Sequence, residues 1–201
     1  MQNLQLAELV CTRISHDLIG NIGAVSNAVE LFEDDPESID EIKPILCLSS
    51  KILSARLKFF RLAFGLSNTS LNSIEEIKTI TDNYIKTIGN PNNPIILNLD
   101  IKTPALYKII MLSAMCLADT FIKGGNINIA ETGNEITFKA TSEHTLSVNK
   151  LQALQNFIKN KTTSDNPAQL APMAYLQYML LKTDVNISLN FNEFEAVLQI
   201  G

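Results

Sequence analysis

Apolar residues recur every three or four positions along the first thirty residues of the chain, which is the period of an amphipathic helix. We therefore predict one helix over residues 3–33. Its apolar stripe comprises Ala7, Val10, Ile14, Leu18, Ile22, Val25, Val29 and Phe32. Asp35 and Pro36 follow, a capping residue and then a proline in the first turn, and they predict the start of a second helix.

The second predicted helix covers residues 36–64 and continues the same period. Its apolar positions are Ile45, Leu48, Ile52, Ala55, Phe59 and Leu62. Pro44 predicts a kink or a restart within this helix, and Gly65 is a plausible C-terminal cap. Two long helices joined by a tight turn form an antiparallel hairpin.

A hairpin of two helices has too little surface to enclose a core. The usual solution is to pair with a second hairpin and form a four-helix bundle. The chain contains one such hairpin, so we predict a homodimer with twofold symmetry, the commonest closed arrangement.

The polar segment LSNTSLNS (66–73) is the expected linker. The pattern changes after it, which divides the chain into a hairpin domain at 1–68 and a second domain at 69–201. There we expect helices at 74–88, 104–122, 148–160 and 168–182, and strands at 95–100, 126–131 and 135–141, with a closing hairpin at 186–200. Helices and strands mix in this half, so the predicted fold class is α+β, with a layered α/β second domain.

Composition limits the function classes. The 201 residues are 46% hydrophobic and 18% charged, with a net charge of −5, so we expect an ordered protein that attracts neither nucleic acid nor anionic membrane in bulk. The N-terminal residues predict no signal peptide, and no segment predicts a membrane span. The three cysteines form no metal-binding pattern, so we expect buried, reduced thiols in a cytoplasmic protein.

His16 lies in the first predicted helix but away from its apolar stripe. At about 100° per residue, it points about 180° from the centre of the stripe. Gly20 and Gly23 lie within about 40° of it on the same wheel, and Arg13 and Asn27 flank this patch. Two interpretations stay open: the glycines let a partner approach the helix backbone, or they permit a bend or a tight helix contact.

An exposed imidazole on a rigid helix can act as a nucleophile, since its ordinary pKa leaves one nitrogen free at neutral pH. Phosphoryl transfer asks little more of a protein than positioning and in-line geometry. The adjacent Asp17 could fix the tautomer of the ring, or it could be a solvated charge.

The antiparallel turn places Arg56 close to the level of His16. Residues 42–72 contain five basic side chains and no acidic one. This segment either attracts an acidic, phosphate-bearing partner or is an ordinary solvated helix face. The basic residues are Lys43, Lys51, Arg56, Lys58 and Arg61.

The segment SHDLIGNIGAV (15–25) resembles the phosphoacceptor box of histidine kinases, H-E-L-R-T-P-L, with His16 at the phosphoacceptor position and Asp17 at the acidic position after it. RISHDLIGNIGAVSNAVELFE (13–33) and SARLKFFRLAFG (54–65) are more similar to the two helices of the ChpT-type histidine phosphotransferases of alphaproteobacteria. The second half is similar in element order to their degenerate kinase ATPase-like domain.

This resemblance implies a phosphorelay. The receiver aspartate of a hybrid histidine kinase (CckA-like) would phosphorylate His16, and His16 would pass the group to response regulators (CtrA-like and CpdR-like). Such proteins are homodimers with a central four-helix bundle. Mg²⁺ would be held by the receiver, so we expect this chain to bind no metal and no cofactor. Arg13, Gly20, Gly23, Asn27 and Arg56 are then the expected receiver-binding residues.

The departures from the kinase pattern are informative. Gly20 stands where kinases have a small polar residue linked to phosphatase chemistry, so we expect poor intrinsic phosphatase activity. Cys116 lies near the place of the kinase asparagine, and no D-x-G-x-G sequence is present. An active histidine kinase is therefore the least favoured interpretation. A regulator that binds receivers or kinases without being phosphorylated is the other alternative, and the intact SHD triplet argues against it.

Overall fold

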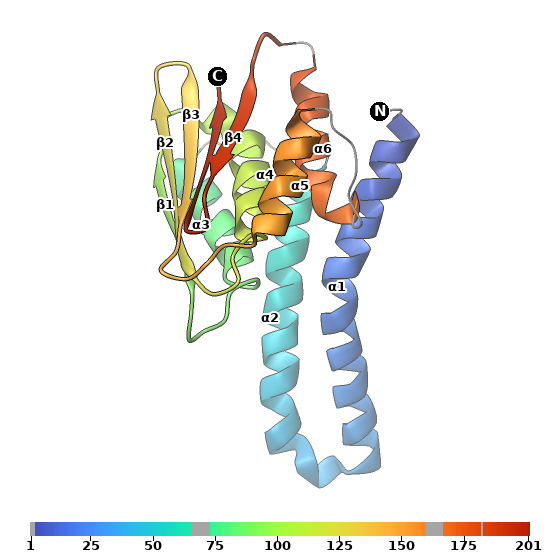
Figure 1. Cartoon of the computed structure of the whole chain (residues 1–201). Helices are drawn as coiled ribbons and strands as arrows, with labels where there is room; N and C mark the ends of the chain where they lie inside the picture. The colour runs from blue at the N-terminus through green and yellow to red at the C-terminus, as the bar shows by residue number, and fades with distance from the viewer. Residues whose placement is uncertain (1–2, 66–72, 160–166, 182) are drawn as a thin grey trace.

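The computed structural model describes residues 3–65, 73–159, 167–181 and 183–201 (Figure 1). The expected domain boundary after residue 68, and all but the last residue of the expected linker, lie outside these ranges. The chain begins with two long antiparallel helices and continues into a five-stranded sheet covered by helices on one side. The predicted α+β class is thus confirmed.

The hairpin follows the sequence pattern closely. Helix α1 runs from Asn3 to Asp34 and helix α2 from Ile39 to Ala63, with a 3₁₀ turn at Pro36–Ser38 between them. The Asp35 side chain accepts a hydrogen bond from the backbone N–H of Glu37, as expected of a capping residue before a proline. The expected restart at Pro44 is wrong, because α2 already begins at Ile39 and continues through the proline.

The second domain begins with helix α3 (Ile74–Ile85) and strand β1 (Ile95–Asp100), followed by helix α4 (Tyr107–Ala118). Strands β2 (Gly125–Thr132) and β3 (Glu135–Thr141) form a hairpin. Helices α5 (Val148–Ile158) and α6 (Ala171–Leu180) come next, and strands β4 (Ile187–Phe191) and β5 (Glu195–Ile200) close the chain. The order in the sheet is β1-β2-β3-β5-β4, with β1 and β2 parallel and the other neighbours antiparallel.

Helix α4 is the centre of the core. Every residue from Ile110 to Ala118 is buried, as predicted from its continuous apolar sequence. The strands alternate buried and exposed positions, because one face of the sheet packs on the helices and the other faces solvent. The upper half of α2 joins this core through Phe59, whose ring stacks on Tyr84 of α3 at 3.8 Å between centroids.

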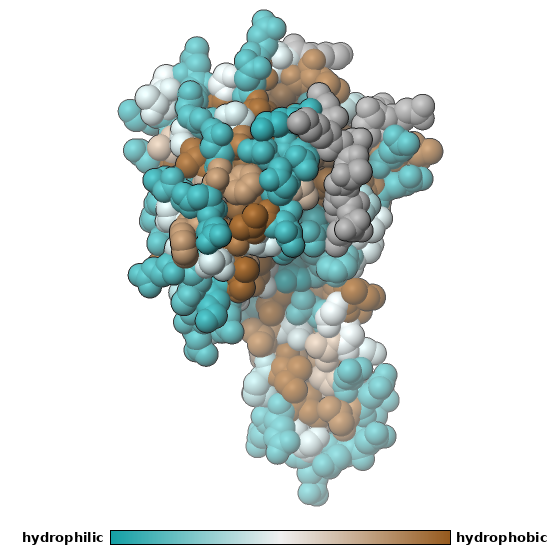
Figure 2. Space-filling model, in the orientation of Figure 1, coloured by the Kyte–Doolittle hydropathy of each residue, from teal (hydrophilic) through white to brown (hydrophobic). Residues whose placement is uncertain are grey.

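The lower half of the hairpin is exposed, and here the structure differs from a simple buried stripe. On α1 the side chains buried within one chain are Leu6, Arg13 and Ala28, which lie to one side of the predicted stripe. Much of the stripe itself faces solvent, and Figure 2 shows the resulting apolar patches along the lower hairpin. The large apolar residues exposed there include Ile19, Ile22, Val29, Phe32, Ile39, Ile45 and Leu48.

Two of the cysteine predictions are wrong. Cys116 is buried, as expected, but Cys11 and Cys47 are exposed on the two hairpin helices. Cys11 lies close to the apolar stripe of α1, which the fold of one chain leaves largely uncovered. None of the helices in the described ranges combines the length and hydropathy that a membrane span requires.

Candidate functional site

His16 lies on α1 with its imidazole in solvent. Its side chain is 77% exposed, although α1 packs along α2 and α6 on other faces. Gly20 and Gly23 follow it on the same side of the helix. A methyl group added at either glycine would meet no heavy atom within 4 Å. Packing inside one chain therefore does not require these glycines, and they leave a stretch of bare helix backbone beside the imidazole. Asn27, one turn further, is exposed on the same side.

Asp17 lies against the ring of His16. Its Oδ1 is 3.2 Å from Nδ1 of the imidazole, and its side chain is only 14% exposed. A neutral imidazole that donates from Nδ1 to a carboxylate has its lone pair on Nε2. The arrangement therefore presents a nucleophilic nitrogen to solvent and holds the other nitrogen on the protein.

Arg13 was expected from the sequence to flank the exposed patch around His16, and this prediction is wrong. Its side chain is 7% exposed and binds two carboxylates. Nε donates to Asp17 Oδ2 at 2.8 Å, and Nη1 and Nη2 donate to the two oxygens of Asp119 at 2.5 and 2.9 Å. The reason is geometric: Arg13 is one turn before Asp17, on the face of α1 that the second domain covers. A partner protein therefore has little access to its guanidinium.

Asp119 was missed in the sequence analysis. It caps the C-terminus of α4 and lies 106 positions after Arg13 in the chain. The available signal was a single acidic residue directly after a continuous apolar helix, in the sequence CLADT. A cationic partner would stabilise such a residue, because the C-terminal end of a helix disfavours negative charge. Nothing in the local sequence identifies Arg13 as that partner.

Arg56 reaches the level of His16, as the antiparallel pairing indicated. Its Nη1 donates to the backbone carbonyl of Asp17. Its Nε and Nη2 donate to the hydroxyl and the carbonyl of Thr87, at 3.0 and 3.1 Å. The guanidinium thus ties α1 to the segment after α3, and it is engaged within the chain rather than displayed to a partner.

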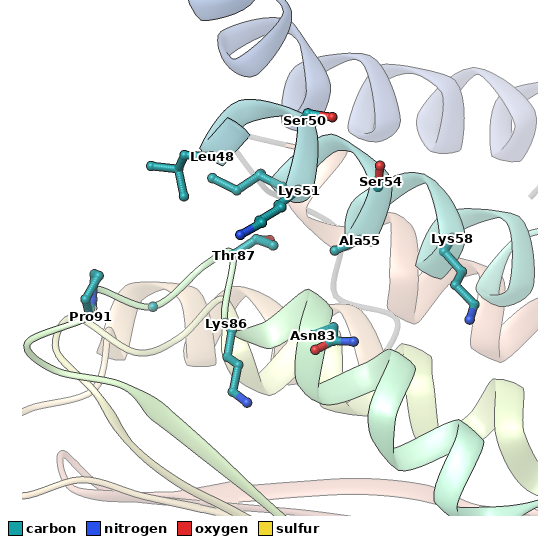
Figure 3. A pocket seen from close by; sticks show the side chains of 12 residues that line it. Leu48, Ser50, Lys51, Ser54, Ala55, Lys58, Asn83, Lys86, Thr87 and Pro91 are labelled. Carbon is teal, nitrogen blue, oxygen red and sulfur yellow. The ribbon is translucent and has the colours of Figure 1, made fainter. Parts of the chain in front are cut away.

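A groove of about 760 Å³ opens between α2 and the segment from α3 to β1, and Thr87 is part of its lining (Figure 3). Lys51 and Lys58 come from α2, and Lys86 lies across from them. All three lysines are exposed, as are Lys43 and Arg61 on the same helix. The basic segment predicted from the sequence is therefore a solvent-facing surface, except for Arg56.

A small cavity lies in the second domain beside the C-terminus of α4. This cavity between α4, α5 and the turn before α6 has a volume of about 20 Å³ among the described residues, and Cys116, Asp119 and Lys150 are part of its lining. A space of that size holds about one water molecule. Burial raises the pKa of the Cys116 thiol, so this residue is a poor ligand for a metal–phosphate group.

Comparisons with known proteins found similarity to phosphotransferases. No protein-family model matches the chain. The protein phosphotransferase ChpT of Brucella abortus (strain 2308) is 39% identical over 67 residues, which is 33% of this chain and 32% of the relative. The match thus spans about a third of the length of that protein.

A solved structure, described as a bacterial phosphotransferase, is similar along the whole chain. It has a TM-score of 0.79 at 18% identity, and the match covers 100% of this chain and 98% of that one. A likeness at this level of identity establishes the shared fold. The histidine kinase AdeS of Acinetobacter baumannii matches more distantly, at 9% identity and a TM-score of 0.42. The partial match to ChpT confirms the resemblance to ChpT-type phosphotransferases, and the solved structure confirms the shared fold.

The open space around Gly20 and Gly23 leads to a prediction about stability. We expect Gly20→Ala and Gly23→Ala each to raise the free energy of unfolding by about 0.5–1 kcal/mol, because alanine restricts the unfolded chain and favours the helix. Chemical denaturation at a fixed chain concentration measures this.

Gly65→Ala is the matched control, since a methyl group there would overlap the carbonyl oxygen of Arg61. It should destabilise the protein. If Gly20→Ala or Gly23→Ala also destabilised it, these glycines would be packing residues.

Proposed function

We propose that this chain is a histidine phosphotransferase that relays a phosphoryl group through His16 between receiver domains. The surroundings of His16 carry the proposal. The imidazole is exposed, its Nδ1 contacts Asp17, and the helix backbone beside it bears no side chain at Gly20 and Gly23. A receiver domain could therefore bring its aspartate to Nε2. The partial sequence match to a phosphotransferase and the shared fold support this proposal.

The chemistry needs one nucleophile and no cofactor on this chain. The Nε2 lone pair attacks the phosphorus of an aspartyl phosphate, the P–O bond to the carboxylate breaks, and that bond's electron pair returns to the aspartate. The ring becomes a cation, and Asp17 stabilises its Nδ1–H. In the second half of the relay, another receiver aspartate attacks the phosphorus and the electron pair of the N–P bond returns to Nε2. The Mg²⁺ for both steps belongs to the receiver domains.

The site offers little for hydrolysis. Gly20, four residues after His16, has no hydroxyl or amide that could orient a water molecule towards the phosphorus. The phosphoryl group is therefore passed on rather than lost, as a relay requires.

The partners follow from charge and from uncovered apolar surface. The exposed lysines on α2 and around the groove favour an acidic surface, such as that around a receiver's phosphorylation site. We propose a receiver domain of a hybrid histidine kinase as donor and response regulators as acceptors. The apolar stripe of the lower hairpin fits a second copy of this chain, in a four-helix bundle.

Two alternatives separate cleanly from this proposal. A regulator that binds receivers without being phosphorylated would have no use for an Nδ1 contact that frees Nε2. An active histidine kinase would need a nucleotide site, but the sequence has no D-x-G-x-G and has Cys116 near the expected place of the kinase asparagine.

Transfer to His16 can be tested with a phosphorylated receiver domain. We expect ³²P label to move to the wild-type chain and not to His16→Ala. Gly23→Leu should slow the transfer at least about tenfold, because its side chain fills the approach to the imidazole.

The Gly23→Leu chain should still fold, since a side chain there meets open space. Transfer of label to His16→Ala, or no transfer of label to the wild type, would refute the proposed activity. A wild-type rate for Gly23→Leu would refute the docking face.

The dimer can be tested on one helix with a matched pair of variants. Ile22 is 49% exposed and Leu31 is 54% exposed, but Leu31 lies about 180° around α1 from Ile22, outside the apolar stripe. We expect Ile22→Glu to convert a dimer into monomers, because a carboxylate would be buried without a partner. Leu31→Glu should remain dimeric.

Sedimentation equilibrium gives the mass of each species. A wild-type monomer at micromolar concentration, or two variants with the same mass, would contradict the proposed interface.

A further inference from the structure

A continuous chain of charged contacts joins the imidazole of His16 to the second domain. His16 Nδ1 contacts Asp17, Asp17 accepts from Arg13, and Arg13 binds both oxygens of Asp119. The first three residues lie within one turn of α1, but Asp119 ends α4, the buried central helix of the other domain. These contacts therefore cross from one domain to the other beside the phosphoacceptor.

We propose that Asp119 is a positioning residue for phosphoryl transfer at His16. It holds the guanidinium of Arg13, and Arg13 in turn fixes the carboxylate of Asp17 against Nδ1 of the imidazole. This inference rests on the proposed phosphotransfer function, and it assigns to the second domain a direct part in orienting the nucleophile.

Arg13 and Asp17 could not maintain this geometry alone. An arginine one turn before an acid is the weaker orientation of a helical ion pair, since the reverse order suits the helix dipole better. Arg13 is also buried, and burial by itself would lower the pKa of its guanidinium. The charge and the hydrogen bonds of Asp119, with the charge of Asp17, hold that pKa above the ordinary value. The buried cation thus depends on Asp119 as its main counter-charge.

Asp119 is itself held firmly. It follows a helix whose residues from Ile110 to Ala118 are all buried, and its backbone carbonyl accepts a hydrogen bond from Lys150 Nζ at 2.7 Å. Its carboxylate binds Arg13 with two parallel hydrogen bonds, a geometry that fixes orientation as well as distance. The second domain therefore offers a rigid anchor.

The two carboxylate oxygens of Asp17 have different partners, and this explains how Asp119 orients the imidazole. Oδ2 accepts from Arg13 Nε, and Oδ1 faces His16 Nδ1. Because Nη1 and Nη2 of Arg13 both donate to Asp119, Nε is left for Asp17. If Asp119 lost its charge, the guanidinium could turn its paired nitrogens towards Asp17 and compete with the imidazole for both oxygens.

The decisive readout is the tautomer of His16 in the unphosphorylated protein, measured by long-range ¹H–¹⁵N NMR at about pH 8. The wild type should favour the Nδ1–H form. Asp119→Asn should lose that preference, and transfer from a phosphorylated receiver should slow about tenfold or more. Asp119→Glu, which keeps the carboxylate, should restore part of both.

Glu195→Gln is the matched control. It removes another carboxylate of the second domain, which pairs with Lys139 at 2.7 Å on the sheet. We expect the tautomer and the transfer rate of this variant to equal those of the wild type.

A second variant separates positioning from a role in stability alone. Arg13→Met/Asp119→Leu replaces the ion pair by apolar side chains of similar volume, which proteins often accept without loss of stability. It should melt near the wild type and still lack the Nδ1–H preference. A wild-type tautomer in Asp119→Asn or in this double variant would overturn the inference.

The two readouts also keep this inference apart from the proposed function. If the wild type accepted no label, the phosphotransfer proposal would fail, while the tautomer would still report whether Asp119 orients the ring. If label moved at the wild-type rate in Asp119→Asn and in the double variant, only the positioning role would fail.

Discussion

A hairpin of two helices must find cover for more apolar surface than the two helices can cover for each other. In this chain the fold of one protomer covers the apolar surface of only half of the hairpin. The upper half packs against the helices of its own second domain, with Phe59 stacked on Tyr84 and Arg13 paired with Asp119. The lower half keeps its apolar stripe in solvent. His16, Gly20 and Gly23 lie on a third face of α1, which packs against neither α2 nor the second domain.

The site follows from this division of faces. Residue 17 is held at three points: its carboxylate meets the imidazole and Arg13, and its carbonyl accepts from Arg56. Both arginines reach partners in the second domain, Asp119 and Thr87. The helix segment that bears His16 is thus braced by the second domain.

Much of the fold could be predicted from local sequence. The helical period of α1 and α2, the Asp35–Pro36 cap and the continuous apolar run of α4 each determine a nearby structure, and each prediction matched. The wheel also placed His16, Gly20 and Gly23 on one uncovered face. Prediction failed where the outcome depends on distant contacts. Arg13 looked like a surface residue because its partner is 106 positions away. Nothing in the spacing of the cysteines revealed that Cys11 and Cys47 are exposed.

The central claim is that His16 is the phosphoacceptor, with Nδ1 held by Asp17 and Nε2 free. Locating the phosphoryl group tests it most directly. After the chain is mixed with a phosphorylated receiver domain, ³¹P–¹⁵N NMR on histidine-labelled protein should show phosphorus bonded to Nε2 of His16. Phosphorus on Nδ1, on another residue, or nowhere on the chain would contradict the account.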